Sequence, residues 1–363
     1  MKIVIDFRIF GTKPGGLGRY NQEFLAELKK IDQDNQYILL FEEDPHLDLP
    51  PNFQIKICRC HWYGLKEQIV LPWLLYRLKP DLVHFTHFNV PFFYYGKYVV
   101  TIHDLIMTKF PSRRATTLNP ILFKVKYLLY QAVIRNAIKR SKKIIAVSKF
   151  TAEDIKNYFK LNQEDAQKIT IVYEGISSLV VDTKQLPQLP QKYFLYVGNA
   201  YPHKNLDFLI ATFGEFLKKY PEYYLVLVGN KNYFYKELEK SNKLSQVVFA
   251  GYVPDELLPA YYKKATAYVF PSLYEGFGLP PLEAMSYGLP VLSSNSSSLP
   301  EILGQSVLYF DPIDQEDLKK KMSEIITNVD LRDQLIKFGY QQIEKYSWRK
   351  MAKETWEIYK ILV

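Results

Sequence analysis

Short runs of β-branched and aromatic residues alternate with longer helical patterns along this chain, and no other feature restricts its fold as much. The runs are apolar at consecutive positions, which is typical of strands buried on both faces of a parallel sheet. Helical patterns such as 21–30 and 118–140 separate several of them. The first series of runs is KIVIDF, QYILLF, FQIKIC, LVHFTH, YVVTIHD, KIIAVS and ITIVYEG.

The pattern then stops and starts again. The segment SSLVVDTKQLPQLPQK contains two prolines and has no clear period, so we interpret it as a linker. A second series of strand-like runs follows it: YFLYVGN, YYLVLVG, QVVFAGY, ATAYVFPS and LPVLSS. The sequence therefore predicts two doubly wound α/β domains, 1–184 and 185–345, followed by a terminal helix over 346–363. In such sheets ligands bind beyond the carboxyl ends of the strands, so we look for chemistry there.

The net charge of +9 is concentrated in one segment. Residues 101–150 hold eleven Lys and Arg and a single acid, Asp104. Within 109–143 the basic residues alternate with a helically spaced apolar stripe made of Leu118, Leu122, Val125, Leu129, Ala132 and Val133. Two interpretations stay open: the segment docks on an anionic membrane surface, or it is a core helix with a solvated basic face.

Other classes of protein fit less well. No helix-turn-helix, zinc-finger or RNA-recognition pattern accompanies the basic segment, so we expect no nucleic-acid partner. No apolar run is long enough to span a membrane, and the start does not read as a signal peptide. The cysteines are Cys58 and Cys60, which we expect to be reduced thiols. These features together predict a cytoplasmic protein.

Two strand ends of the first domain carry candidate residues. Gly15 and Gly16 precede a helical pattern, where glycines allow backbone N–H groups and the helix dipole to meet an anion. A glycine-rich turn without a ligand explains the same residues. His103 ends the run YVVTIHD, where an imidazole can hydrogen-bond a polar substrate or transfer protons near neutral pH. Asp104 orients this histidine or caps the next helix.

The second domain repeats this arrangement at Lys204. The strand YFLYVGN is followed by a loop and by Lys204 at the start of a helix. A lysine at this edge is a suitable partner for phosphate, although a solvated surface lysine is the alternative.

The most unusual stretch is YEGFGLPPLE, which follows the strand ATAYVFPS. Glu275 lies in the loop, and Glu283 is expected in the first turn of the next helix. Gly276 and Gly278 allow the backbone N–H groups of the loop to face a ligand, and two prolines fix the entry into the helix. Carboxylates at this spacing suit the sugar and the ribose of one nucleotide sugar, whereas a pair of helix-capping acids is the plain alternative.

The chain resembles glycosyltransferase family 4, the retaining nucleotide-sugar transferases of the GT-B fold. EGFGLPPLE with the following GLPVLSSNSSSLPEILG carries the resemblance, and GGLGRY, IHD, VSKFTAEDI and VGNAYPHKNL support it in the expected order. The run SNSSSLPE is most similar to bacterial mannosyl- and rhamnosyltransferases of polysaccharide synthesis. The resemblance implies two Rossmann-like domains facing a central cleft, an acceptor-binding first domain, a nucleotide-sugar-binding second domain, and a last helix that crosses back to the first.

The resemblance also implies roles for matching residues. His103, Lys204 and Glu275 would form the catalytic group: His103 contacts the donor sugar near the reacting carbon, Lys204 meets the diphosphate, and Glu275 holds the sugar. The other donor-binding positions would be Gly15, Gly16, Phe277, Gly278, Leu279 and Glu283, with Glu283 on the ribose. Asn199 and His203 stand near the place where many members carry an arginine, so His203 is expected to supply a pH-dependent charge.

We expect no cofactor and no metal. The pair Asp32 and Asp34 forms the chain's DxD pattern, but it follows a helix and so faces the wrong end of the sheet. The expected reaction moves a hexose, mannose from GDP-mannose being favoured, to a glycan or lipid-linked acceptor, on the inner face of the plasma membrane if the basic segment docks there. A sugar phosphorylase or a sugar-nucleotide epimerase of the same fold is the alternative.

Overall fold

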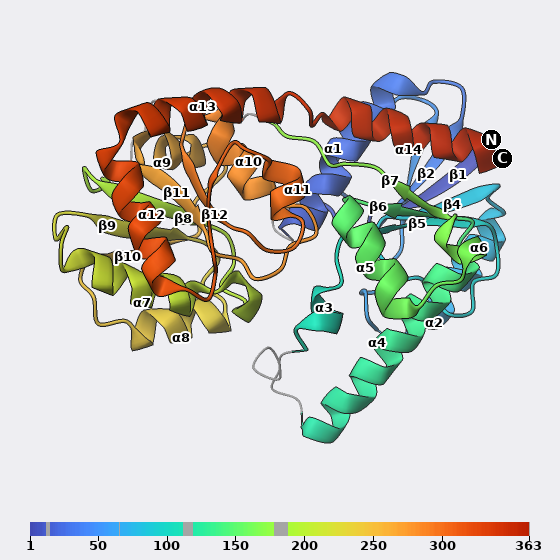
Figure 1. Ribbon diagram of the computed structural model, residues 1–363. Coiled ribbons are helices and arrows are strands. Elements are labelled where there is room, and N and C mark those ends of the chain that lie inside the picture. Colours follow the sequence, from blue (N-terminus) through green and yellow to red (C-terminus); the bar gives the residue numbers. More distant parts are fainter. Residues whose placement is uncertain (12–14, 65, 112–118, 178–187, 363) are drawn as a thin grey trace. The chain divides into compact units, whose positions relative to one another are not determined.

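The computed structural model describes residues 1–11, 15–64, 66–111, 119–177 and 188–362. These residues divide into two compact units (Figure 1). The first comprises Met1–Leu105, Leu118–Gly175 and Ser347–Val363, and the second Ile106–Thr117 and Ile176–Tyr346. The predicted boundary at 184/185 lies outside the described residues.

The first unit contains a parallel sheet with strand order β3-β2-β1-β4-β5-β6-β7. The strand numbers decrease from β3 to β1 and then increase from β4 to β7 across the sheet. The switch point of the sheet therefore lies between β1 and β4. The strands are β1 (Lys2–Asp6), β2 (Gln36–Phe41), β3 (Phe53–Ile57), β4 (Leu82–Phe85), β5 (Tyr98–Ile102), β6 (Lys143–Ala146) and β7 (Ile169–Ile171). The helices are α1 (Gly16–Ile31), α2 (Glu67–Leu78), α4 (Pro120–Arg140), α5 (Lys149–Phe159), α6 (Gln163–Ala166) and α14 (Trp348–Leu362).

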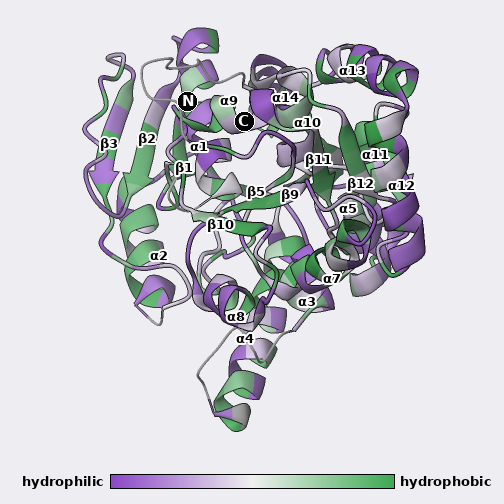
Figure 2. Cartoon of the chain, turned by 90° about the vertical axis from the view of Figure 1, so that its left-hand side faces the viewer, coloured by the Kyte–Doolittle hydropathy of each residue, from purple (hydrophilic) through white to green (hydrophobic). Residues whose placement is uncertain are grey.

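Burial explains the continuous apolar runs. β4 and β5 are buried at every position, whereas in β3 at the edge of the sheet only Phe53 is buried. Figure 2 shows a parallel contrast in hydropathy, because β2 is mostly green and β3 carries purple. The prediction of a buried parallel sheet is confirmed for this unit.

The second unit repeats the architecture with the strand order β10-β9-β8-β11-β12-β13. Its strands are β8 (Tyr193–Val197), β9 (Tyr224–Val228), β10 (Val247–Gly251), β11 (Ala267–Phe270), β12 (Val291–Ser294) and β13 (Leu308–Phe310). Its helices are α3 (Ile106–Lys109), η2 (Pro202–Lys204), α7 (Leu206–Leu217), α8 (Tyr233–Ser241), α9 (Leu258–Lys264), α10 (Leu279–Ser286), α11 (Leu299–Leu303), α12 (Gln315–Thr327) and α13 (Val329–Ile343). The switch point here lies between β8 and β11.

The last helix, α14, belongs to the first unit and packs along α1 (Figure 1). Two polar contacts hold it, the first buried and the second partly buried. The Tyr359 hydroxyl lies 2.5 Å from Nδ1 of His84 in β4, and the Trp356 indole N–H donates to Asp32 at 2.7 Å. The chain end is therefore built into the core of the sheet with which the chain begins.

The basic segment forms α4, and its two halves differ. The C-terminal half is a core helix, since Tyr130, Ile134 and Ile138 are buried. In the N-terminal half the predicted stripe is exposed instead: Leu122 is 54% accessible and Leu129 56%. Figure 2 shows green and purple residues side by side along this helix. Leu118 lies outside the described residues. None of the described helices is long and apolar enough to cross a membrane.

Candidate active site

The loop after β11 presents Glu275 at the carboxyl end of the second sheet. Glu275 is 7% accessible, and its carboxylate forms an ion pair with the Lys204 ammonium at 2.5 Å. Lys204 ends η2, in the loop after β8, so the two residues come from the strands that flank the switch point. A backbone hydrogen bond from Leu273 to the His203 carbonyl, 2.8 Å long, ties the two loops together. The structure thus brings together two residues that stand 71 positions apart.

The loop conformation depends on serines that the sequence analysis did not single out. The Glu275 N–H donates to the Ser297 hydroxyl at 2.8 Å, and the Ser298 hydroxyl lies 3.0 Å from the Glu275 carbonyl and 3.2 Å from that of Phe277. Both serines belong to SNSSSLPE, which served only as a mark of resemblance. A polar run directly after a buried strand was the available signal, because buried hydroxyls need partners.

The helix that follows begins one turn earlier than expected. α10 starts at Leu279, so Glu283 is its fifth residue and does not lie in the first turn. Gly278 precedes the helix with a φ of +103°, a conformation that favours glycine. The Glu283 carboxylate accepts a hydrogen bond from the Tyr262 hydroxyl at 3.3 Å and stays half-buried. The Phe277 ring is buried, packed edge-on against Tyr346, so only its backbone is open to a role in binding.

The expectation that His203 supplies a pH-dependent charge is wrong. His203 is 7% accessible, and burial, together with the neighbouring Lys204 ammonium, lowers its pKa to about 4, although Glu275 acts in the opposite direction. The imidazole is therefore neutral at physiological pH. Asn199 is half-buried, and its side-chain oxygen accepts from the Tyr201 N–H at 3.2 Å.

Three predicted site residues lie in the first unit. Gly15 precedes α1 with a φ of +81°, and a Cβ built on Gly15 or Gly16 would meet no atom within 4 Å. The start of this 16-residue helix therefore has space beside it and no acid in its first turn. Such a terminus is suited to an anion.

His103 is the third, and both of its ring nitrogens have partners. Nδ1 lies 2.9 Å from the Glu174 carboxylate, and Nε2 lies 3.0 Å from the Thr86 carbonyl. Both partners are hydrogen-bond acceptors, and together they fix the orientation of the ring. Glu174, and not Asp104, is thus the carboxylate that orients His103. It stands 71 positions further along the chain and was missed because nothing local marks it.

The DxD pattern has a structural role at Asp32. Its carboxylate accepts hydrogen bonds from the Tyr37 hydroxyl, the Asn35 side chain and the Trp356 indole, as well as from two backbone N–H groups. Burial raises the pKa of Asp32, but the hydrogen bonds from Tyr37 and Asn35 outweigh it and lower the pKa below its usual value. In the described part of the chain no group of three His, Cys, Asp or Glu residues is arranged to hold a metal ion.

Comparison with known proteins agrees with this architecture. A family model described as Glycosyltransferase Family 4 matches residues 14–178, and one described as Glycosyl transferases group 1 matches residues 181–342. The O-antigen chain mannosyltransferase B of Escherichia coli is 28% identical over 98% of this chain and 99% of its own length. The O-antigen chain mannosyltransferase RfbU of Salmonella typhimurium is 27% identical over 97% of each chain. Among solved structures, a sucrose-phosphate synthase from Thermosynechococcus elongatus superposes with a TM-score of 0.78 at 17% identity, over 100% of this chain and 99% of that one.

Two parallel-sheet α/β units of this kind, matched over the whole chain by this solved structure, define the GT-B fold. The two family models together cover most of the chain, and the chain belongs to glycosyltransferase family 4. It is a glycosyltransferase that acts on hexoses.

Proposed function

We propose that this chain transfers mannose from GDP-mannose to a hydroxyl of a glycan or lipid-linked acceptor, with retention of anomeric configuration and without a metal ion. The observation that carries the proposal is the Lys204–Glu275 pair at the switch point of the second sheet, with Glu283 on the helix that follows. The curated relatives named above support mannose as the sugar and a surface polysaccharide as the product.

The second unit supplies the groups for the donor. Glu283 accepts from the ribose hydroxyls, and Glu275 accepts from the sugar hydroxyls. The backbone of Phe277, Gly278 and Leu279 lies beside the same sugar. Lys204 faces the diphosphate, where Asn199 and the neutral His203 complete the surface without adding charge.

Departure of the nucleoside diphosphate requires positive charge near its oxygens. Lys204 provides it, and Glu275 holds the ammonium in position until the donor binds. Fixed charges that are already oriented need little reorganisation during the reaction, so a single buried lysine contributes more here than in water. This arrangement supports a reaction that continues in the presence of EDTA.

The first unit contributes Gly15, Gly16 and His103. The N-terminus of α1 offers free N–H groups to the diphosphate or to the acceptor. A contact between His103 and the donor sugar requires that the ring exchange its hydrogen bond to Thr86 or to Glu174 for one to the sugar. Replacing His103 by Gln tests this role, because a glutamine cannot satisfy two acceptors in the same geometry.

Association with the inner face of the plasma membrane is also part of the proposal. The exposed half of α4 carries large apolar side chains among its lysines, as described above. A second exposed group lies on α2 and the loop 92–95: Ile69, Trp73, Tyr76, Phe92, Phe93 and Tyr95. Two arginines stack on rings of this group: Arg77 of α2 lies 4.7 Å from Trp73, and Arg140 at the end of α4 lies 3.7 Å from Tyr95. Exposed aromatic rings beside arginines are typical of surfaces that dock on anionic lipid.

Sedimentation with vesicles tests the membrane part. We expect the chain to pellet with phosphatidylglycerol vesicles at low salt, and less at high salt. The double variant Leu122→Glu/Leu129→Glu should remain in the supernatant. Ile313→Glu is the matched control, because Ile313 is 80% accessible and belongs to the second unit. Equal pelleting of all three proteins would contradict this docking surface.

Product analysis tests the reaction itself. The protein is incubated with GDP-mannose and octyl glycosides, and the product is examined by mass spectrometry and by NMR of the anomeric proton. We expect a mannosylated glycoside with the anomeric configuration of the donor, in equal yield with EDTA. Mannose 1-phosphate formed only with added phosphate would indicate a phosphorylase. A sugar nucleotide that is changed in the absence of any acceptor would indicate an epimerase. Either result would contradict the proposal.

A further inference from the structure

A small polar pocket lies at the switch point of the first sheet. It measures about 20 Å³ and is lined by Asp6, Arg8, Ile9, Trp62, Thr86, His87 and Asn89. Asp6 ends β1 and Thr86 directly follows β4, the neighbouring strand on the other side of the switch point. Ligands of open parallel sheets bind at this place. The pocket includes none of the residues assigned to the donor.

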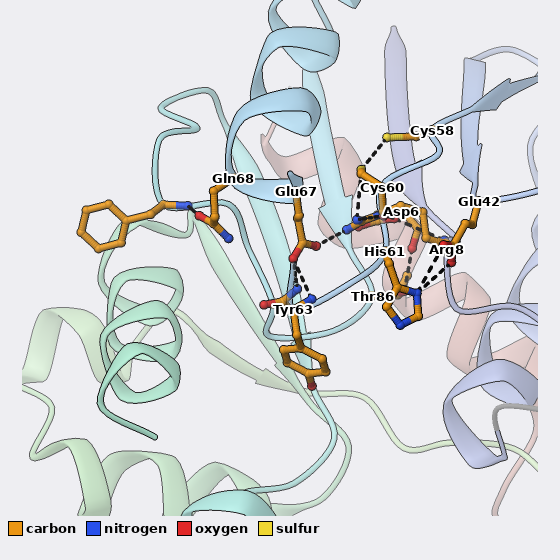
Figure 3. Close-up of polar contacts among 12 residues, drawn as sticks. Asp6, Arg8, Glu42, Cys58, Cys60, His61, Tyr63, Glu67, Gln68 and Thr86 are labelled. Atoms are coloured by element: carbon orange, nitrogen blue, oxygen red, sulfur yellow. Dashed lines mark hydrogen bonds and ion pairs between the residues drawn. The ribbon is translucent and has the colours of Figure 1, made fainter. Parts of the chain in front are cut away.

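The Arg8 guanidinium in this pocket is fully occupied by the protein (Figure 3). Nε and Nη2 donate to Asp6 at 2.8 and 2.7 Å, and Nη2 also donates to Glu67 at 2.6 Å. Nη1 donates to the carbonyl of Cys60 at 3.0 Å and lies 3.5 Å from its sulfur. These contacts use all five donors of the side chain. Two carboxylates therefore surround one cation that has no donor left, so the pocket is not built for phosphate or carboxylate.

The pocket offers hydrogen-bonding capacity of another kind. Asp6 and Arg8 line the pocket, and the Asp6 side chain is the more accessible of the two, at 10% compared with 3%. Its Oδ2 atom accepts from Arg8, and a carboxylate oxygen has room for a further donor. The Nδ1 atom of His87 is buried and has no hydrogen-bond partner among the described residues. Burial and the nearby His103 and Arg8 lower the pKa of His87 to about 3, so its ring is neutral.

The size of the pocket limits what can enter. A cavity of this volume holds about one water-sized group, since a water needs roughly 10–15 Å³ by the same measure. A hydroxyl fits this space, donates to Asp6 and can pair with the neutral imidazole of His87. The half-buried Trp62 supplies an aromatic surface beside it, which suits the apolar face of a sugar ring.

We propose that this pocket binds one hydroxyl of the acceptor sugar and that Asp6 is the residue that selects it. The proposal rests on the transferase function above, and it assigns the switch point of the first sheet to acceptor recognition. Asp6 acts as a specificity residue for an uncharged, hydroxylated acceptor.

The test pairs protein variants with deoxy acceptors. Octyl glycosides of mannose, rhamnose, glucose, galactose and N-acetylglucosamine are first compared as acceptors and as ligands that raise the melting temperature. The best of them is then compared with its monodeoxy derivatives. For the wild type we expect one derivative to lose about 10- to 100-fold in kcat/KM, the effect of one hydrogen bond to a charged group. Asp6→Asn should lower kcat/KM for the parent glycoside by a similar factor. It should leave kcat/KM for that deoxy derivative unchanged.

Two further variants separate binding from folding. Glu42→Gln is the matched control, since Glu42 pairs with His61 at the same edge of the sheet and does not line the pocket (Figure 3). It should behave as the wild type. His87→Leu leaves the Arg8 cluster intact and should reduce discrimination at the same hydroxyl, so the test remains valid if Asp6→Asn folds poorly.

The outcomes are distinct. The proposal would be overturned if Asp6→Asn and His87→Leu each lowered kcat/KM by the same factor for the parent glycoside and for every deoxy derivative. Unchanged kcat/KM in both variants would overturn it as well. So would a wild type that neither glycosylates nor binds any glycoside while it still turns over GDP-mannose. A wild type that does not turn over GDP-mannose at all would instead contradict the proposed function. A melting-temperature shift with GDP that is unchanged in Asp6→Asn shows that the donor site of that variant is intact.

Discussion

The ion pair between Lys204 and Glu275 allows stability and catalysis to be separated. The two side chains are only 13% and 9% accessible and their charges lie 2.5 Å apart. Removing one partner of a buried pair typically costs about 3–5 kcal/mol, because it leaves the other charge uncompensated. The residual exposure of both groups reduces this, so we expect Glu275→Gln and Lys204→Met each to lower the free energy of unfolding by about 1–3 kcal/mol. For a unit of this size that corresponds to a melting temperature lower by roughly 2–4 °C per kcal/mol.

The double variant gives the decisive comparison. With both charges removed, no buried charge remains without a partner. The double variant should therefore lose less unfolding free energy than the sum of the two single losses. Activity should not return, because loss of a preorganised charge at the leaving group costs about 10²- to 10³-fold in kcat. Thermal unfolding and steady-state kinetics on all four proteins measure the two effects. A double variant in which stability and activity recover together would refute the reasoning, as would strictly additive losses of stability.

Three further predictions concern pH, backbone and the last helix. The pKa of His203 falls from 6.5 to about 4 on folding, so the unfolded chain binds the proton more readily between these pH values. The stability contributed by the neutral ring is complete above pH 6.5 and is lost as the pH falls toward 4. In denaturation at several pH values, His203→Gln should remove up to about 3 kcal/mol of this loss. Gly278→Ala should destabilise by about 1–2 kcal/mol, because its φ is +103° and a Cβ would lie 2.7 Å from Leu299, whereas Gly16→Ala should change the melting temperature little. Trp356→Phe removes a hydrogen bond to the buried Asp32 carboxylate and should cost about 1.5–3 kcal/mol at neutral pH in urea unfolding, with a smaller difference at acid pH, where Asp32 becomes protonated.

The fold was predictable because its signal is local. Each apolar run corresponds to a strand of the structure, and the restart after the linker corresponds to the second sheet. The strand that escaped prediction is β13, which has three residues at the edge of its sheet. Its length alone does not explain this, since β7 is equally short and was predicted; the pairing of β13 with β12 is decided by tertiary packing.

The site was predictable only in part. Motif spacing singled out Lys204, Glu275 and Glu283, because each lies in a loop or helix that follows a strand of the second series. It could not show that Lys204 and Glu275 form a pair, or that Glu174 holds His103, because each contact joins residues 71 positions apart. Such pairs depend on the order in which the strands assemble in the sheet.

The pKa of His203 and the pocket around Asp6 escaped prediction for a related reason. Burial lowers the pKa of His203, and burial is a property of the packed loop, not of the sequence PHK. The Asp6 pocket combines residues from the ends of β1 and β4 and the segment after β3. None of these residues forms a motif with its sequence neighbours.

Binding of nucleoside diphosphates to the protein tests whether the second unit holds the donor. The melting temperature is measured with GDP, UDP, ADP and dTDP, each with and without EDTA, for the wild type and for Glu283→Ala. A ligand at 100 times its dissociation constant stabilises the folded state by about 2.7 kcal/mol. We expect that GDP raises the melting temperature, that EDTA does not change this shift, and that Glu283→Ala abolishes it. No shift with any nucleotide, or an equal shift in Glu283→Ala, would contradict the assignment of the donor site to the second unit.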